Sequence, residues 1–114
     1  MKLLTDDERD RLLDNGAATA RGEKRDPLPV AKLYTPDAHV AWLLTELNPA
    51  DGDTAYGLCD AGIGWPELGY VRVSDLEAMR GPNGFSVARD PHFAPRLTLS
   101  DYALRAKEDG SIND

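Results

Sequence analysis

The feature that most constrains the fold is the apolar run from His39 to Leu47. In a β-strand, successive side chains point to opposite faces, and in this run both faces are mostly apolar. A strand of this kind belongs in the centre of a sheet rather than at its edge. The apolar side chains are Val40, Trp42 and Leu44 on one face, and Ala41, Leu43 and Leu47 on the other.

Clusters of turn residues divide the rest of the chain into short strands. Asn48 to Asp53 is a dense cluster of this kind, so the strand after it should form an antiparallel hairpin with the central one. A second loop, rich in glycine, spans residues 61–66 and precedes another strand. The predicted strands are 30–34, 39–47, 54–59, 68–73 and a short last one at 85–88.

Three helices are predicted from capping patterns at their first residues, where a hydroxyl side chain accepts a hydrogen bond from a free amide of the first turn. The first helix contains an Asn15-Gly16 pair, so it ends either before or after this weak point. The expected spans are 6 to 14 or 21, 75–80 and about 100–107, with caps at Thr5 (with Glu8), Ser74 (with Glu77) and Ser100.

These elements predict an α+β fold, since strands and helices do not alternate as they do in parallel α/β proteins. We expect a mostly antiparallel sheet of about four or five strands, with the helices packed on one face. A chain of 114 residues is the usual length of one domain. Residues 1–114 should therefore form a single domain, with a tail that frays from about Ser111.

The charge distribution limits the class of partner. The chain has 20 acidic and 13 basic side chains, a formal net charge of −7, and this sign opposes binding to a phosphate backbone. Residues 27–75 hold seven of the acids but only two bases, Lys32 and Arg72. We therefore expect no direct nucleic-acid partner, and a protein partner that has a basic surface.

The chain has few signals of export or membrane attachment. Its one cysteine, Cys59, permits no internal disulfide and is expected to be buried as a small apolar residue. No apolar run is long enough to span a bilayer, and the opening residues become acidic too soon for a signal peptide. We expect a cytoplasmic protein without a membrane partner.

Several segments of the chain resemble one bacterial family, the domain of unknown function 2958 family. The resemblance extends over nearly the whole chain and implies no activity, cofactor or catalytic residues. Members of the family are typical of plasmids, integrative elements and phages, which implies a role in mobile-element biology, including counter-defence. The segments that carry the resemblance are Lys2–Thr5, Leu28–Pro36, Trp42–Leu47, Tyr56–Asp60, Pro66–Val71 and Arg89–Phe93.

Two carboxylates, Asp60 and Glu67, flank the glycine-rich loop. If strands 54–60 and 67–73 pair as a hairpin, these side chains face each other, and opposed like charges destabilise a strand pair. A divalent cation, a cationic ligand or a shared proton could compensate, with Glu46 or Asp75 as a third member. The alternative is that both side chains point into water, or that an arginine such as Arg72 pairs with them.

Trp65 lies in the same loop, where it is either a recognition anchor or a lid folded over the sheet. The neighbouring Gly62-Ile63-Gly64 lacks the third glycine and the lysine of phosphate-binding loops. His39, Cys59 and His92 have no metal-ligand spacing. We expect no cofactor and no metal, the Asp60, Glu67 and Glu46 alternative excepted.

Two functional hypotheses follow. The first is a non-enzymatic accessory protein of a mobile genetic element that binds a basic protein surface through an acidic face, with a counter-defence role. The second is a small metal-dependent or acid/base enzyme that uses Asp60 and Glu67. The lack of a recognisable reaction centre favours the first. Its predicted partner-binding residues are Asp37, Asp51, Asp53, Asp60, Trp65 and Glu67.

Overall fold

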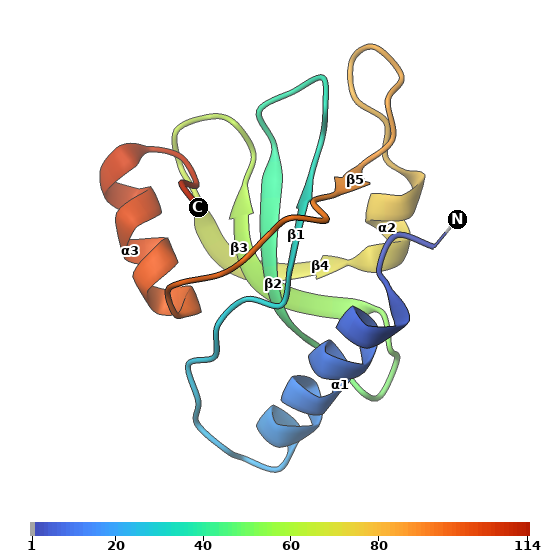
Figure 1. Ribbon diagram of the computed structural model, residues 1–114, viewed down its shortest axis with the longest axis vertical. Helices are drawn as coiled ribbons and strands as arrows, with labels where there is room; N and C mark the ends of the chain where they lie inside the picture. The colour runs from blue at the N-terminus through green and yellow to red at the C-terminus, as the bar shows by residue number, and fades with distance from the viewer. Residues whose placement is uncertain (1) are drawn as a thin grey trace.

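The computed structural model describes residues 2–114 and shows an α+β fold built on one antiparallel sheet (Figure 1). The predicted fold class and antiparallel sheet are confirmed. Most predicted strands agree with the observed ones within two residues. In chain order, the elements are α1 (Asp6–Ala20), β1 (Ala31–Tyr34), β2 (Ala41–Leu47), β3 (Thr54–Asp60), β4 (Glu67–Arg72), α2 (Val73–Ala78), β5 (Ala88–Arg89) and α3 (Leu99–Asp109).

The five strands lie in the order β4-β3-β2-β1-β5, and every neighbouring pair is antiparallel. β2 is the central strand, as its two apolar faces predict. The register between β2 and β3 shifts between Leu44 and Glu46, which marks a β-bulge. The last predicted strand, at 85–88, is instead a pair of residues, Ala88 and Arg89, at the β1 edge.

The helices cover both faces of the sheet, which corrects the expectation that they pack on one. Adjacent residues of β2 belong to different core clusters: Leu44 packs in the cluster that includes Leu12 of α1 and Leu76 of α2. Leu43 packs with Leu58 and with the apolar side of α3. The physical reason is the sequence of β2 itself, because a strand that is apolar on both faces needs a cover on each.

The N-terminus of α1 has the predicted capping box. The Glu8 amide donates to the Thr5 hydroxyl at 3.1 Å, and the Glu8 carboxylate accepts from the Thr5 amide at 3.0 Å. The helix passes through Gly16 and ends at Ala20, the longer of the two expected spans. Gly16 is required there by packing, since a Cβ would overlap the carbonyl oxygen of Leu47 in β2. This contact explains a glycine inside a helix.

The other two helix starts differ from the predictions. α2 begins at Val73, and the expected Ser74–Glu77 capping box does not form. The Glu77 carboxylate instead accepts from the Leu3 amide at 3.0 Å. α3 begins at Leu99 with Thr98 as its cap, while Ser100 hydrogen-bonds to the Asp26 carboxylate. In both places, a hydrogen bond to a residue distant in sequence replaces the local capping bond that the sequence pattern predicts.

The segment after α3, predicted to fray, contacts the sheet side of the molecule. The Ile112 amide donates to the Asp60 carboxylate at 3.0 Å, and the Lys32 ammonium lies 2.5 Å from the Asp114 carboxylate. Among residues 2–114, none of the helices combines the length and the apolar character that a membrane span requires.

Candidate functional site

The expected pairing of Asp60 with Glu67 is not formed. In the β3–β4 register Glu67 lies opposite Cys59, and Asp60 is one residue further along. Successive strand residues point to opposite faces, so the Asp60 side chain lies on the face of Leu58 and α3, and the Glu67 side chain on the other. The prediction that these carboxylates oppose each other is therefore wrong, because the hairpin register differs by one residue from the register it requires.

Asp60 is a buried structural residue. The residue is only 6% exposed to solvent. One carboxylate oxygen accepts from the Gly62 amide at 2.8 Å and the other from the Ile112 amide at 3.0 Å. The carboxylate thus closes the turn after β3 and holds the C-terminal segment against the sheet, so both of its oxygens are engaged within the chain.

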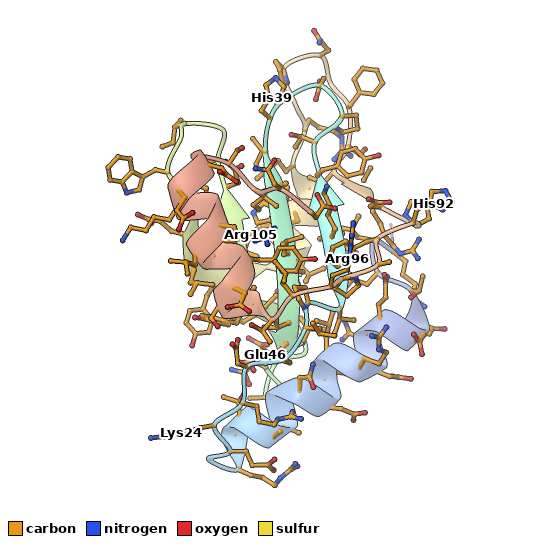
Figure 2. All side chains as sticks on the ribbon, turned by 60° about the vertical axis from the view of Figure 1, so that its left-hand side comes forward. Lys24, His39, Glu46, His92, Arg96 and Arg105 are labelled. Carbon is orange, nitrogen blue, oxygen red and sulfur yellow. The ribbon has the colours of Figure 1, made fainter. Side chains whose placement is uncertain are left out.

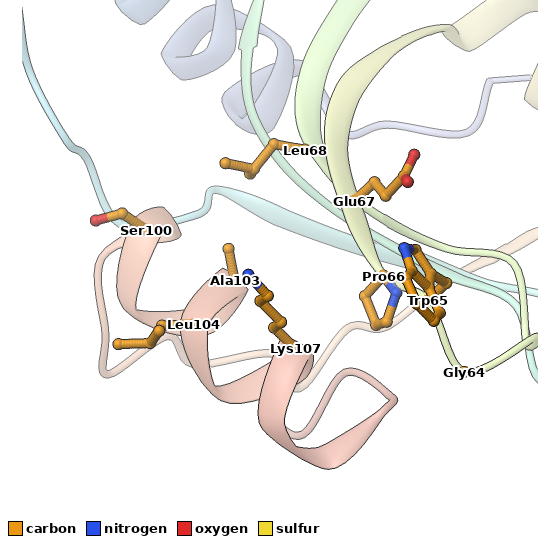
Figure 3. A pocket seen from close by; sticks show the side chains of 9 residues that line it. All are labelled: Gly64, Trp65, Pro66, Glu67, Leu68, Ser100, Ala103, Leu104 and Lys107. Carbon is orange, nitrogen blue, oxygen red and sulfur yellow. The ribbon is translucent and has the colours of Figure 1, made fainter.

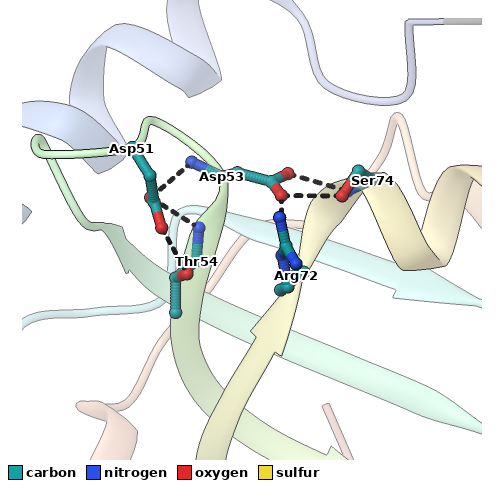
Figure 4. A network of polar contacts seen from close by, with 5 residues as sticks. All are labelled: Asp51, Asp53, Thr54, Arg72 and Ser74. Atoms are coloured by element: carbon teal, nitrogen blue, oxygen red, sulfur yellow. Dashed lines mark hydrogen bonds and ion pairs between the residues drawn. The ribbon is translucent and has the colours of Figure 1, made fainter.

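Asp51 and Asp53 form a polar network at the opposite end of β3 (Figure 4). The Asp51 carboxylate accepts from the Thr54 hydroxyl at 2.6 Å and from the amides of Thr54 and Asp53, both at 2.9 Å. Hydrogen bonds from the Thr54 hydroxyl, above all, lower the pKa of Asp51 to about 2. This carboxylate stabilises its own turn and stays ionised at neutral pH.

The Asp53 carboxylate reaches from this turn to the start of α2. It accepts from the Ser74 hydroxyl at 2.6 Å and the Ser74 amide at 2.8 Å, and Arg72 donates to it at 3.1 Å. These contacts lower the pKa of Asp53, and the Ser74 hydroxyl has the largest effect. Asp53 is thus an N-terminal cap supplied to α2 by another element.

The five acidic residues expected to make one acidic face are spread over the molecule. Asp53 directly precedes β3 and Asp60 is its last residue, so the length of the extended strand separates them by roughly 20 Å. Asp37 accepts from the Asn83 amide at 2.7 Å and so holds the loop after α2. Its second oxygen is buried and has no hydrogen-bond partner within the described residues. Glu67 alone of the five makes no hydrogen bond or ion pair within residues 2–114.

The residues considered for metal or nucleophilic chemistry are also dispersed. Glu46 accepts from the Thr19 hydroxyl at 2.6 Å and lies far from both histidines, His39 and His92, which are themselves well separated (Figure 2). Within residues 2–114 no group of three His, Cys, Asp or Glu side chains could hold a metal ion. Cys59 is half-buried, and burial raises the pKa of its thiol, which disfavours the reactive thiolate.

Trp65 points outward and does not fold over the sheet as a lid. It is 72% exposed and its neighbour in the loop, Ile63, is 78% exposed. Trp65 borders an open groove of about 680 Å³ between the start of β4 and α3 (Figure 3). The lining is mostly apolar and consists of Gly64, Trp65, Pro66, Glu67, Leu68, Ser100, Ala103, Leu104 and Lys107. Contiguous exposed apolar surface of this kind is typical of binding sites.

A second hollow continues the groove along β4. It shares Leu68 and Ser100 with the first and has a volume of about 620 Å³. Its wall contains the aromatic pair Tyr56 and Tyr70, whose ring centroids lie 5.0 Å apart. Tyr70 itself is 73% exposed. We call the surface formed by Trp65, Leu68, Tyr70 and Leu104 the β4 rim.

One protein family matches this chain over almost its full length. The family model described as "Protein of unknown function (DUF2958)" matches residues 3–113. The chain belongs to the DUF2958 family. The comparisons found no match among curated proteins and none among solved structures. The resemblance stated from the sequence is thereby confirmed.

Sequence reasoning found one residue of the β4 rim of this DUF2958 protein, Trp65, and missed the others. The sequence pattern predicts a strand for Leu68 and Tyr70 but not which of its faces is covered, and it predicts a helix for Leu104. The signal was present in the alternation of Leu68 and Tyr70, which places two large apolar side chains on one face of a strand. The order of strands in the sheet, which leaves that face partly open, is a tertiary property.

Proposed function

We propose that this DUF2958 protein is a non-enzymatic, cytoplasmic accessory protein of a mobile genetic element, and that it acts by binding another protein through the β4 rim. The observation that carries the proposal is the exposure of Trp65 beside an apolar groove. Exposed tryptophan and tyrosine side chains are costly to leave in water and are enriched where partners bind. Trp65 and Tyr70 meet this description at one rim.

In this proposal, the acidic residues attract the partner from a distance and do not form its main contacts. Asp51, Asp53 and Asp60 are engaged in hydrogen bonds within the chain, so they are poor candidates for strong contacts to a partner. The net charge of −7 still produces a long-range field that attracts a basic protein. Glu67, which is exposed between Trp65 and Leu68 with its side chain on the face away from α3, adds to this field beside the β4 rim.

The mobile-element setting and the counter-defence role rest on what the family resemblance implies, together with the sign of the charge. A protein that handles nucleic acid has a basic surface, because it must bind phosphates. An acidic protein of small size can occupy such a surface and block it. A nucleic-acid-handling defence protein of the host is therefore the class of partner that we propose.

The enzyme hypothesis receives no support from a specific observation. It required Asp60 and Glu67 to face each other, and the strand register places them on opposite faces of the sheet. Glu46 lies opposite Tyr56, four residues before Asp60 along β3.

The proposal is tested by affinity capture from the native host with three forms of the protein: wild type, Trp65→Ala and Phe85→Ala. Phe85 is the matched control, since it is also a large exposed aromatic residue but lies outside the β4 rim. We expect one or more proteins to be captured by wild type and Phe85→Ala and lost with Trp65→Ala. Equal capture by all three forms would show that the β4 rim is not the binding surface.

A further inference from the structure

The outer edge of β4 has backbone groups without partners. The Val73 amide donates to the Asp53 carbonyl oxygen at 2.9 Å, which fixes the alternation along the strand. Odd-numbered residues of β4 therefore direct their N–H and C=O groups toward β3, and even-numbered residues direct them away. Within the described residues, no strand pairs with β4 on that side. The backbone groups of Leu68 and Tyr70 thus point to an open edge.

This edge lacks the devices that usually protect a sheet from pairing with another chain. Natural edge strands are made short, carry charges or proline, or are covered. The opposite edge follows this rule, because β5 has only two residues. β4 has six, and the four between Glu67 and Arg72 carry no charge. An edge of this length that is left open is suited to receive another strand.

The side chains next to the open edge are also suited to the addition of another strand. Leu68 and Tyr70, whose backbone groups face outward, have their side chains on the α3 side of the sheet, where the two hollows lie. A strand added to β4 would place every second side chain beside them. The groove toward Leu104 and Trp65 would receive these apolar side chains. Backbone pairing and side-chain pockets thus occur at one place.

We propose that the β4 rim binds its partner by strand addition: an extended segment of the partner, with apolar side chains at alternate positions, pairs with the backbone of Leu68 and Tyr70. This inference rests on the proposed function and specifies its mode. Donors and acceptors that repeat every second residue match another extended backbone. The net charge of −7 on each chain opposes pairing between two copies, so the segment belongs to a different protein.

The test uses random linear peptides of about twelve residues, displayed on phage and selected against the wild-type protein. Each selected peptide is then titrated against wild type, Tyr70→Pro and Tyr70→Ala. Proline removes the outward N–H of residue 70, which β3 does not use, so an edge strand can accept it. Alanine removes the side chain and keeps the N–H. We expect Tyr70→Pro to weaken binding about tenfold more than Tyr70→Ala.

Amide hydrogen exchange of the wild-type protein gives a readout that does not depend on any variant folding. The amides of Leu68 and Tyr70 should exchange fast in the free protein and at least about tenfold more slowly with the peptide bound. The amides of Gly69 and Val71, already paired with β3, serve as internal controls and should change little. Far-UV circular dichroism of Tyr70→Pro checks that its fold is intact.

Three results would overturn strand addition. The first is a bound peptide that leaves the amides of Leu68 and Tyr70 unprotected, and the second is a selection that yields no peptide with a higher affinity for wild type than for Tyr70→Pro. The third is a protein dimer that Tyr70→Pro dissociates. The last result would assign the edge to a second copy. If Trp65→Ala abolishes capture of the native partner while Tyr70→Pro does not, the proposed function holds and strand addition fails. If neither variant affects capture, both fail.

Discussion

The Asp53 carboxylate accepts a hydrogen bond of 2.8 Å from the Ser74 amide, although 21 residues separate the two in sequence. The same carboxylate accepts from Arg72, the last residue of β4 (Figure 4). One side chain of the β2–β3 turn therefore fixes both the end of β4 and the start of α2. The strand that forms the β4 rim is held in place at this end by a residue of another hairpin.

Replacing Asp53 with alanine should lower the free energy of unfolding by about 1–2 kcal/mol, the usual cost of removing a helix cap. The backbone amide and the hydroxyl of Ser74, at the start of α2, would both lose their acceptor. Asp75→Ala is the control, since Asp75 lies exposed in the first turn of the same helix and contributes only to the helix dipole. Urea denaturation measures both variants, and equal losses would contradict the capping role.

The acid stability of the protein should depend on the same turn. Hydrogen bonds lower the pKa of Asp51 to about 2 and lower the pKa of Asp53, each chiefly through a hydroxyl side chain. A carboxylate with a lowered pKa in the folded state contributes stability above the pKa of the unfolded chain, about 3.9, and this contribution is lost as the pH falls through the folded pKa. The loss should therefore fall between about pH 4 and pH 2.

The melting temperature of wild type should decrease over that interval more steeply than that of the double variant Asp51→Asn/Asp53→Asn. Asparagine does not titrate, so the variant starts lower at neutral pH and then approaches wild type in acid. Thermal unfolding at a series of pH values measures the difference. Parallel curves for the two proteins would show that these carboxylates have the same pKa in the folded and unfolded chains.

Asp60→Asn should destabilise the protein by about 1–3 kcal/mol, because one of two buried acceptors becomes an amide donor that faces an N–H group. A repulsive pair with Glu67 would produce the opposite sign, a gain in stability upon replacement. Glu67→Gln is the matched control and should change the melting temperature little, since Glu67 is exposed. If Asp60→Asn raises the melting temperature, the assignment of Asp60 as an acceptor for Gly62 and Ile112 is wrong.

Local patterns of the sequence were sufficient for most elements of the fold. The Thr5–Glu8 capping box and the two apolar faces of β2 act over a few residues, and both are found as predicted. The same β2 pattern also contained the evidence that helices cover both faces, since Leu43 and Leu44 each need a cover. That consequence is physical and could have been derived from the sequence.

The candidate site was harder to predict because it depends on register and on distant partners. A shift of one residue in a strand pair moves a side chain to the other face, and this is what separates Asp60 from Glu67. The acceptors at Asp53 and Asp60 are used by Ser74 and Ile112, which lie in other elements. No local pattern identifies such partners, so acidic residues that looked free in the sequence are engaged in the fold.

Gly16→Ala should destabilise the protein by about 1–3 kcal/mol or more, although alanine is the better helix former. The added methyl group would overlap the Leu47 carbonyl oxygen and force α1 away from β2. Gly69→Ala is the control, because a Cβ at Gly69 has no atom of the described chain within 4 Å. Chemical denaturation of both variants measures the contrast, and a gain in stability for Gly16→Ala would show that α1 does not approach β2 this closely.

Contact and charge at the β4 rim should affect different rate constants for binding to the partner that is purified after affinity capture. Trp65→Ala should act mainly on dissociation, which we expect to be at least about tenfold faster, since a buried aromatic anchor holds the complex after it has formed. The fold should not change, because Trp65 is exposed and outside both core clusters. Phe85→Ala serves again as the control and should leave both rates unchanged.

The double charge reversal Glu67→Lys/Asp75→Lys should act on the other rate. Both residues are exposed acids without a hydrogen bond or ion pair inside the described chain, so their reversal changes the net charge from −7 to −3 with little effect on the fold. Association with a basic partner should become severalfold slower at low salt, and the difference should shrink at high salt, where the Debye length is short. Surface plasmon resonance at two ionic strengths measures both rates. If charge reversal leaves association unchanged at low salt while Trp65→Ala still accelerates dissociation, the partner binds through the apolar rim alone and its surface is not basic.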